Sequence, residues 1–594
     1  MKNIIVREYL ESLTESDELD YILPMLLEVM GHKIISNPRI TKGLPQYGKD
    51  VVSIGVDKDG IRKRFYCEVK GGADKDVTTT TFSKTDGIRE SIIEARDRGF
   101  NDASNPDFEN LPIKIVLAHN GIIKANVKET FDGFIQREFP AAEKPVKKKW
   151  WKRNKNKNGV GYEFERWDIY ELTELFTQHL FNEYLLTDAE ATNLFKKVLV
   201  LLNTPRNNYA DYFNLVNHVF EKAGLAANMG ERKRLLFFET MRMISFIVYH
   251  YSKDAQNLNA AIKCIPYSVL RLWNWILENN LEGDAKVRAH FDKNVGILFQ
   301  ALKEYFERTL PVAKMKDGIW APNGGRYEQV GYPVRAMDYI GNLILYFKFQ
   351  QNREENNQEL LDNQINDLTS ILNSNDGTIR PIFDNHSIPV CLVLNFLIEN
   401  GRIEDAKEYL RNVQGAIQVA QQTHQRLPDG KNRIESVIRY IVRRQKSAYY
   451  EDATSHLFGI LLEYMAVLDM KDEYDAFKKF ITAMKIDIAV FEPYDNAQLQ
   501  QYQPDNNFEH EQNLLSHTLY QEGYQAEITL NEEFSDFQAK TFAKPVFAYP
   551  YKTQQSGYDY LLLLAHVYFK TPLFPSAWRN IRILVAEEDV RVTN

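Results

Sequence analysis

Residues 46–72 read QYGKDVVSIGVDKDGIRKRFYCEVKGG, and this stretch decides the fold of the N-terminal part of the chain. The β-branched, apolar run Val51 to Val56 predicts a buried strand. Arg64 to Lys70 predicts the returning strand of a hairpin. Asp57 to Gly60 supplies the turn between them, because Asp and Gly tolerate the left-handed backbone of a short hairpin.

Three charged residues are expected at one end of this hairpin. Asp50 stands at the head of the first strand, and Glu68 and Lys70 stand near the end of the second. These positions are neighbours in an antiparallel pair, and residues two apart on a strand point to one face. Two carboxylates that converge with an ammonium group are costly unless something binds between them, and a divalent metal is the natural candidate.

The hairpin belongs to an N-terminal α/β domain, which we expect over residues 1–185. Helical and strand patterns alternate there in the order α-β-β-β-α-β-α-β-α, which predicts a mixed sheet flanked by helices. After the hairpin, the expected elements are a helix at 83–98, a strand at 113–118, a helix at 124–137, a strand at 162–169 and a helix at 171–185.

A large all-α region follows this domain. Residues 186–485 carry one helical pattern after another with short polar connections, which predicts a helical-repeat-like array for assembly or sensing. No fixed repeat period is visible. Residues 486–594 are expected to form a mostly helical C-terminal region of unclear role.

Composition narrows the class of protein. The chain has 594 residues, of which 44% are hydrophobic and 26% charged, as in a soluble globular protein of several domains. Its formal net charge of -8 argues against a uniformly basic nucleic-acid coat, although a local basic groove remains compatible with it. The start lacks an apolar signal core and the longest late apolar run, residues 561–569, is too short to span a bilayer. We therefore expect a cytoplasmic protein without membrane contact.

The Glu-x-Lys triplet means little by itself. A second copy, Glu231 to Lys233, falls on a predicted helix. Only Glu68 to Lys70 lies on an apolar strand whose paired strand begins with an acid, Asp50. This context, and not the triplet, makes the site a candidate.

The combination resembles the PD-(D/E)XK nuclease superfamily, in particular the Mrr-like restriction endonuclease domains of bacterial antiphage defence systems. The resemblance covers roughly residues 17–180. Asp50 matches the acid of the family, Glu68-Val69-Lys70 matches its Glu-x-Lys, and Asp20 matches its helix acid. Two features depart from the family: the helix acid is Asp in place of Glu, and Tyr47-Gly48-Lys49 replaces the usual Gly-rich run.

The resemblance implies a Mg²⁺-dependent (or Mn²⁺-dependent) DNA endonuclease of a restriction or antiphage system. Asp50, Glu68 and the Val69 carbonyl would hold the metal, with Asp20 as an outer ligand. Lys70 would orient or deprotonate the attacking water. Such nucleases often work with a separate ATPase or sensor subunit, and the helical region is large enough for a homo-oligomer. For Asp20, the alternative is an ordinary acid at a helix N-terminus, which the helix dipole favours.

Further residues are candidates for DNA contact, each against the reading of a solvated turn or loop. Near the hairpin they are Gln46, Lys75 and Lys84. Residues 144–157 form the basic cluster interleaved with aromatic residues, where lysines suit phosphates and tryptophans suit unpaired bases. Its candidates are Lys147, Lys148, Lys149, Trp150, Trp151, Lys152 and Arg153.

Two other functions stay open on the sequence. One is a helical scaffold or adaptor whose nuclease fold has lost its chemistry. The other is a structure-specific DNA repair nuclease, such as a junction resolvase. The first would leave Asp50, Glu68 and Lys70 as a structural ion cluster.

Overall fold

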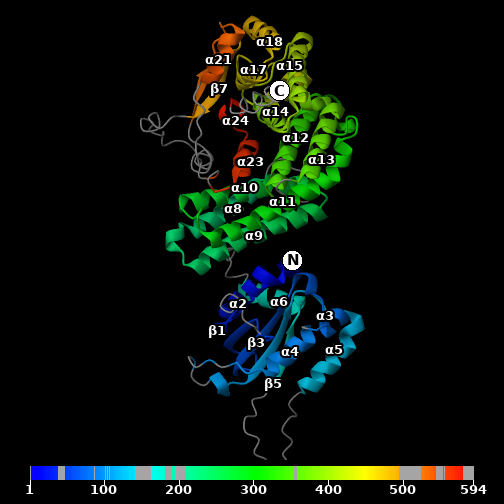
Figure 1. Ribbon diagram of the computed structural model, residues 1–594, viewed down its shortest axis with the longest axis vertical. Coiled ribbons are helices and arrows are strands. Elements are labelled where there is room, and N and C mark those ends of the chain that lie inside the picture. Colours follow the sequence, from blue (N-terminus) through cyan, green and yellow to red (C-terminus); the bar gives the residue numbers. More distant parts are fainter. Residues whose placement is uncertain are drawn as a thin grey trace, which may run out of the picture. The chain divides into compact units, whose positions relative to one another are not determined.

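The computed structural model describes most of the chain. The described residues are 2–11, 13–37, 47–85, 87–100, 102, 105, 108–140, 162–180, 190–191, 193–194, 197–198, 209–353, 357–493, 523–530, 532–543, 553 and 556–579. The chain forms two compact units (Figure 1). Unit 1 comprises Met1–Val200, Ala210–Gly224 and Met229–Ile247, and unit 2 comprises Leu201–Tyr209, Leu225–Asn228 and Val248–Asn594. The division into three domains at residues 1–185, 186–485 and 486–594 stays a prediction.

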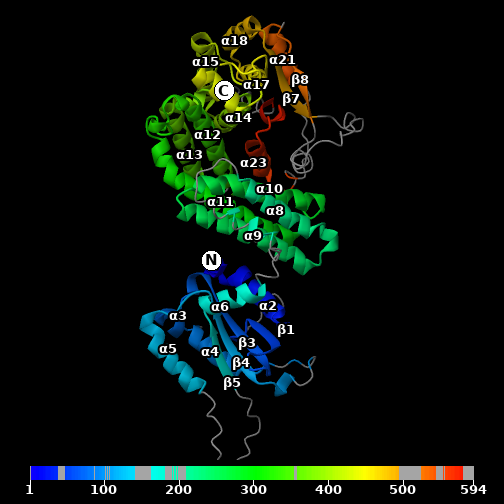
Figure 2. The same cartoon turned by 180° about the vertical axis from the view of Figure 1, so that it is seen from behind.

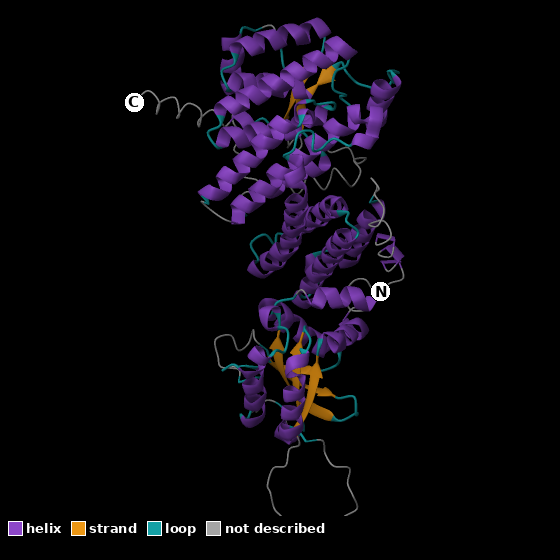
Figure 3. Ribbon diagram, turned by 90° about the vertical axis from the view of Figure 1, so that its right-hand side faces the viewer, coloured by secondary structure: helices purple, strands orange, loops and turns teal. Residues whose placement is uncertain are grey.

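Unit 1 contains a five-stranded mixed sheet, drawn in orange in Figure 3. The strand order is β1-β2-β3-β4-β5. The pairs β1–β2 and β2–β3 are antiparallel, whereas the pairs β3–β4 and β4–β5 are parallel. The strands are β1 (Lys33–Ser36), β2 (Val51–Val56), β3 (Arg62–Lys70), β4 (Ile113–His119) and β5 (Tyr162–Trp167).

Helices flank this sheet, so the predicted α/β fold class of the N-terminal part is confirmed. They are α1 (Lys2–Glu11), η1 (Glu15–Leu19), α2 (Asp20–Val29), α3 (Thr79–Ser83), α4 (Ile88–Asp97), α5 (Ala125–Glu138), α6 (Ile169–Leu175) and η4 (Phe176–Leu180), with α8 (Ala210–Ala223) and the first part of α9 (Glu231–Asp254) in the same unit. The expected helix over residues 83–98 begins only at Ile88, as α4, because the backbone leaves the helical region at Lys84, where the separate short helix α3 ends.

The core explains the strand pattern. Every residue of β4 is buried, as expected for a central strand covered on both faces. On one face, apolar side chains of β2, β3 and β4 pack with those of α3, α4 and α5. The views from the two sides show α4 and α5 against the sheet (Figures 1 and 2).

Unit 2 is the large helical region that the sequence predicts. Its main helices are the last part of α9, α10 (Leu258–Glu278), α11 (Ala285–Ala313), α12 (Glu328–Arg353), α13 (Gln358–Ser374), α14 (Ser387–Glu399), α15 (Ile403–His424), α16 (Ile434–Arg443), α17 (His456–Val467), α18 (Lys471–Met484), α21 (Phe534–Ala543), α23 (Asp559–Phe569) and α24 (Ser576–Arg579). Within the described ranges, no helix is both long and apolar enough to cross a bilayer.

Unit 2 also holds a small sheet that the sequence pattern does not predict. It comprises β6 (Thr454–Ser455), β7 (Asp487–Pro493) and β8 (Gly523–Glu527), in that order. β6 has two residues and pairs with β7 more than thirty positions away in the sequence. Such a short strand has no detectable period of its own, so only the paired structure reveals it.

Candidate functional site

Asp50 is held at one end of the β2–β3 hairpin. It immediately precedes β2, whose first residue, Val51, lies opposite Cys67 of β3. The Asp50 Oδ2 atom accepts a hydrogen bond of 2.8 Å from the backbone N–H of Val69. This bond places the carboxylate beside the two residues that flank Val69 in the sequence, Glu68 and Lys70.

The residues before Asp50 pass very close to helix α4. Tyr47 and Gly48 both have positive φ, 51° and 70°. A Cβ atom on Gly48 would lie 1.9 Å from the backbone oxygen of Ser91 in α4. The chain can therefore approach α4 this closely only because residue 48 lacks a side chain.

Glu68 and Lys70 point to one face of β3 and form an ion pair. Glu68 is 4% exposed. The Lys70 Nζ atom lies 2.9 Å from Glu68 Oε1 and donates a hydrogen bond of 2.9 Å to the Val69 carbonyl. Asp50, Glu68, Val69 and Lys70 thus lie together at the end of the hairpin.

Glu15 joins this cluster, and the sequence pattern does not predict it. Its Oε1 atom lies 3.2 Å from Lys70 Nζ, and its Oε2 atom accepts a hydrogen bond of 3.4 Å from the Gly71 N–H. η1 can come this close because Gly71 has no side chain. A Cβ atom on Gly71 would lie only 2.8 Å from the Glu15 nitrogen. Glu15 is 55 positions from Lys70, so no local spacing relates the two.

The surroundings of the cluster raise the pKa of both Asp50 and Lys70. Burial and the charge of Glu68 raise the pKa of Asp50 to about 8, although Lys70 and the Val69 N–H act in the opposite direction. Burial alone would lower the pKa of Lys70, but Glu68, Glu15 and Asp50 raise it above its usual value. Lys70 therefore stays charged at neutral pH, whereas the Asp50 carboxyl is mostly protonated there in the absence of a metal.

The donor set fits a hard divalent cation. Asp50 and Glu68 offer carboxylate oxygens and Val69 offers a carbonyl oxygen, which are the ligand types that Mg²⁺ and Mn²⁺ accept. The raised pKa of Asp50 shows that burial and the charge of Glu68 disfavour its carboxylate more than Lys70 favours it. Lys70 is the cation that meets Glu68 and the Val69 carbonyl in this structure.

The remaining predicted residues are placed as follows. Asp20 is the half-buried first residue of α2, and its role as an outer ligand stays a prediction. Lys75 donates a hydrogen bond of 3.4 Å to the Glu11 carbonyl. Lys84 forms an ion pair of 2.8 Å with Asp74, and both side chains are exposed. Outside the described residues lie Gln46 and the basic cluster with Lys147, Lys148, Lys149, Trp150, Trp151, Lys152 and Arg153.

The second Glu-x-Lys triplet provides an internal comparison. Glu231 and Lys233 lie in the first turn of α9, and both are exposed. Glu68 is buried on a strand beside another carboxylate. The two triplets therefore share residue types but not an environment.

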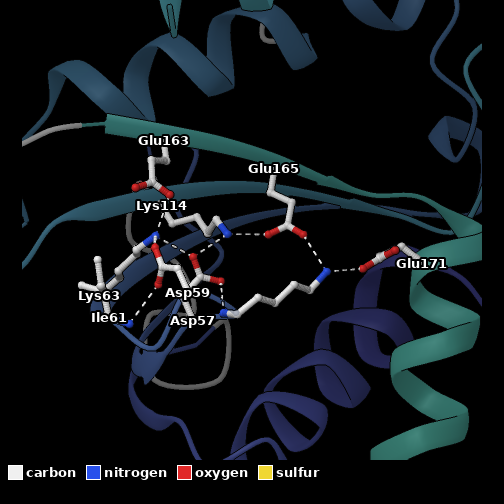
Figure 4. Close-up of polar contacts among 9 residues, drawn as sticks. Asp57, Asp59, Ile61, Lys63, Lys114, Glu163, Glu165 and Glu171 are labelled. Atoms are coloured by element: carbon white, nitrogen blue, oxygen red, sulfur yellow. Dashed lines mark hydrogen bonds and ion pairs between the residues drawn. The ribbon is translucent and has the colours of Figure 1, made fainter. Parts of the chain in front are cut away.

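A different acidic group also has the geometry to hold an ion. Ligand atoms of Asp57, Asp59 and Glu163 lie within 4.8 Å of one another. They surround the Lys63 ammonium, whose Nζ lies 2.7, 2.6 and 2.7 Å from these three carboxylates (Figure 4). The Lys63 side chain is only 2% exposed, so the group encloses an ammonium ion of the chain itself.

This ion network continues along the same end of the sheet. Lys114 joins Asp57 to Glu165 with contacts of 2.7 Å each (Figure 4). Lys58 then joins Glu165 to Glu171 in α6. Burial would raise the pKa of Asp57, but the hydrogen bonds from Lys114 and Lys63 lower it to about 2. Asp57 follows β2 whereas Asp50 precedes it, so this network stabilises the hairpin at the end away from the Asp50 cluster.

His119 is a further buried polar residue near the cluster that the sequence did not single out. It is the last residue of β4 and lies opposite Lys70 in the β3–β4 register. Its Nδ1 atom is 3.0 Å from the Lys75 carbonyl. Burial lowers its pKa to about 4, so the imidazole is neutral at physiological pH.

No protein-family model, curated protein or solved structure matches this chain. The functional interpretation therefore depends on the geometry of Asp50, Glu68 and Lys70 and on the chemistry of their side chains.

Proposed function

We propose that unit 1 is a Mg²⁺- or Mn²⁺-dependent DNA endonuclease, the effector of a bacterial restriction or antiphage defence system. One observation carries the proposal: Asp50, Glu68 and Lys70 gather at one end of a hairpin, and the pKa of Asp50 is raised to about 8. Paired carboxylates with an adjacent lysine are the groups that metal-assisted phosphodiester hydrolysis requires.

The raised pKa supports a cation at this place. Asp50 and Glu68 repel each other in a partly buried environment, and that repulsion costs free energy. A divalent ion held by both carboxylates would remove the repulsion. When bound, such an ion polarises a scissile phosphate and lowers the pKa of a coordinated water.

Lys70 then has the role of a charged donor. Its pKa is raised by three neighbouring carboxylates, so its ammonium group is not a base at neutral pH. Such a group orients an attacking water or binds a phosphate oxygen as negative charge develops. Glu15 and Glu68 hold the ammonium group in place through contacts of 3.2 and 2.9 Å.

DNA is the proposed substrate, and unit 2 is proposed to serve assembly or sensing. A homo-oligomer or a separate ATPase or sensor subunit would contact this helical region. These assignments rest on the resemblance of residues 17–180 to restriction endonucleases.

A scaffold with an inactive nuclease fold is the second candidate. The observation that favours it is the pairing of Lys70 with both Glu68 and Glu15, because a lysine satisfied in this way also suits a structural ion cluster. In that case the metal would have no part in the function of the chain.

Plasmid cleavage separates the two candidates. The full chain is incubated with supercoiled plasmid and Mg²⁺ or Mn²⁺, with EDTA as the metal-free control. We expect nicking or linearisation that Asp50→Ala and Lys70→Ala abolish. Glu231→Ala is the matched control, because it alters the exposed Glu-x-Lys triplet of α9. Equal cleavage by Asp50→Ala and wild type would refute the site, and a lack of cleavage even with proteins from neighbouring genes would favour the scaffold.

A further inference from the structure

Unit 2 contains a stretch with a concentrated positive charge. Residues 431–446, KNRIESVIRYIVRRQK, hold six basic residues and one acidic residue, Glu435, in a chain whose net charge is -8. All six are exposed: Lys431, Arg433, Arg439, Arg443, Arg444 and Lys446. Lys446 pairs with Asp452 at 2.6 Å. No ion pair between described residues joins the other five to a carboxylate, so their charge is available to a ligand.

Helix α16 (Ile434–Arg443) lies within this stretch, with apolar residues on one face and arginines on the other. Val437 is fully buried in an apolar cluster with Val330, Ile382, Phe383 and Tyr450, and Ile438, Ile441 and Val442 pack against the same cluster. Arg439 and Arg443 are one helical turn apart on the exposed side. The core therefore covers Val437 fully and Ile438, Ile441 and Val442 in part, while Arg439 and Arg443 stay exposed.

Exposed aromatic side chains lie on the element next to α16. The short helix η6 (Pro322–Tyr327) contacts both α16 and α12. It exposes Arg326, and its last residue, Tyr327, is 55% exposed. Trp320, just before η6, is 40% exposed. Exposed aromatic residues on an element that contacts a basic helix are typical of surfaces that bind unpaired bases.

Hydrogen bonds with Glu328 and Arg335 hold the loop that carries these aromatic residues. Glu328 is buried and accepts hydrogen bonds from the Arg335 guanidinium and, at 3.0 Å, from the Ala321 N–H. Arg335 also donates to the Ile319 carbonyl at 3.2 Å. The Trp320 ring rests edge-on against Tyr332, with ring centroids 5.3 Å apart. These contacts hold the loop backbone and the Trp320 ring in place, which reduces the ordering entropy lost on binding.

We propose that α16 and η6 form a binding surface for a single nucleic-acid strand. Arg439, Arg443 and the basic residues around them contact the phosphate backbone, and Trp320 and Tyr327 stack on unpaired bases. A membrane surface fits less well, because a membrane-bound amphipathic helix inserts its apolar face, whereas Val437 is buried in the core and Ile438 and Ile441 pack against it. This surface lies in unit 2 and rests on none of the residues of the Asp50 cluster.

Binding without cleavage tests the proposal. The full chain, in EDTA, is titrated against a fluorescent 30-nucleotide single strand while anisotropy is recorded at several salt concentrations. We expect Arg439→Gln/Arg443→Gln to weaken binding about tenfold and to reduce the slope of log K against log salt by about 1.4, which is about 0.7 for each lost phosphate contact. Lys471→Gln/Lys479→Gln is the matched control, because it removes two exposed charges from α18, and it should bind as wild type does.

The aromatic residues have a separate readout. Trp320→Ala/Tyr327→Ala is expected to weaken binding of the single strand about tenfold and to leave binding of a blunt duplex unchanged, because duplex bases cannot stack on these rings. Arg439→Lys/Arg443→Lys keeps the charges and should retain the salt slope, which separates lost phosphate contacts from misfolding.

Three results would overturn the proposal. The first is wild-type affinity and salt slope in the Arg439→Gln/Arg443→Gln protein. The second is an equal loss in the α18 control pair. The third is capture by phosphatidylserine vesicles that depends on Arg439 and Arg443 while strand binding does not. Because metal is absent, the outcome is independent of cleavage, and the same titration in an Asp50→Asn background separates it from the proposed nuclease function.

Discussion

The Asp50 carboxylate accepts a 2.8 Å hydrogen bond from the backbone N–H of Val69, which joins the head of β2 to the tail of β3. This bond sets an acid beside Glu68 and Lys70, which flank Val69 in the sequence. The carboxylate is partly satisfied by the N–H, yet burial and the Glu68 charge still raise its pKa to about 8. The site therefore holds its two acids close together at a cost in stability.

Asp50→Asn should stabilise the metal-free protein at pH 8 by on the order of 5 kcal/mol, which is a rise of about four pKa units at about 1.4 kcal/mol each. The folded-state pKa of Asp50 lies above its ordinary value of 3.8. Between about pH 4 and pH 8 the unfolded state ionises while the folded state stays protonated, so the protein loses stability as pH rises. Asn cannot ionise, and its side-chain oxygen can still accept from the Val69 N–H. Urea unfolding in EDTA measures the difference, which should shrink at pH 5, where folded Asp50 is still protonated. A variant less stable than wild type at pH 8 would contradict the pKa assignment.

Divalent cations should stabilise the protein through the same residues. At about 100 times its dissociation constant, Mn²⁺ or Mg²⁺ is expected to add about 2.7 kcal/mol to the free energy of unfolding at pH 8. Asp50→Asn and Glu68→Gln should each remove this gain, whereas Glu231→Gln should keep it. Thermal melting with and without cation gives the answer. An equal gain in all four proteins would place the cation elsewhere.

Lys63→Met should lower the free energy of unfolding by about 3 kcal/mol, because it leaves Asp57, Asp59 and Glu163 without the ammonium group that they surround. Lys58→Met should cost less than about 1 kcal/mol, since Lys58 is an exposed ion-pair partner in the same network. Denaturant unfolding of the two variants measures the contrast. Similar losses in both would show that burial of Lys63 does not matter.

The Asp57 carboxylate gives this network a pH dependence. Its folded-state pKa is lowered to about 2, so its contribution to stability is complete above the unfolded value of 3.8 and is lost as pH falls toward 2. Lys63→Met should lose less stability over that range than wild type, because one of the two lysines that lower the pKa of Asp57 is gone. Unfolding curves between pH 5 and pH 2 test this, and parallel losses in both proteins would argue against it.

Gly48→Ala should destabilise unit 1 by at least about 3 kcal/mol, because a Cβ would overlap the Ser91 carbonyl and residue 48 has a positive φ. Gly60→Ala is the matched control. Gly60 also has a positive φ, 80°, but has open space around it, so its replacement should cost only about 1 to 2 kcal/mol. Equal losses in the free energy of unfolding for Gly48→Ala and Gly60→Ala would show that the overlap with Ser91 of α4 does not destabilise the protein.

The fold of unit 1 was largely predictable from residue patterns. The apolar run of β4 and the turn at Asp57 to Gly60 are local features, and they predict strand and turn without knowledge of contacts. The mixed sheet and its flanking helices confirm that prediction. The small sheet of unit 2 escaped it, because the two residues of β6 pair with a strand far along the chain.

The sequence by itself determined that Asp50, Glu68 and Lys70 belong to one end of one hairpin, since strand period and hairpin register are properties of neighbouring residues. Only the tertiary structure decided what surrounds them. Glu15 reaches Lys70 from 55 positions away, and Glu163 reaches Lys63 from 100 positions away. Burial and the field of distant charges arise when separate segments pack together, so the raised pKa of Asp50 and the enclosure of Lys63 have no signature in the local sequence.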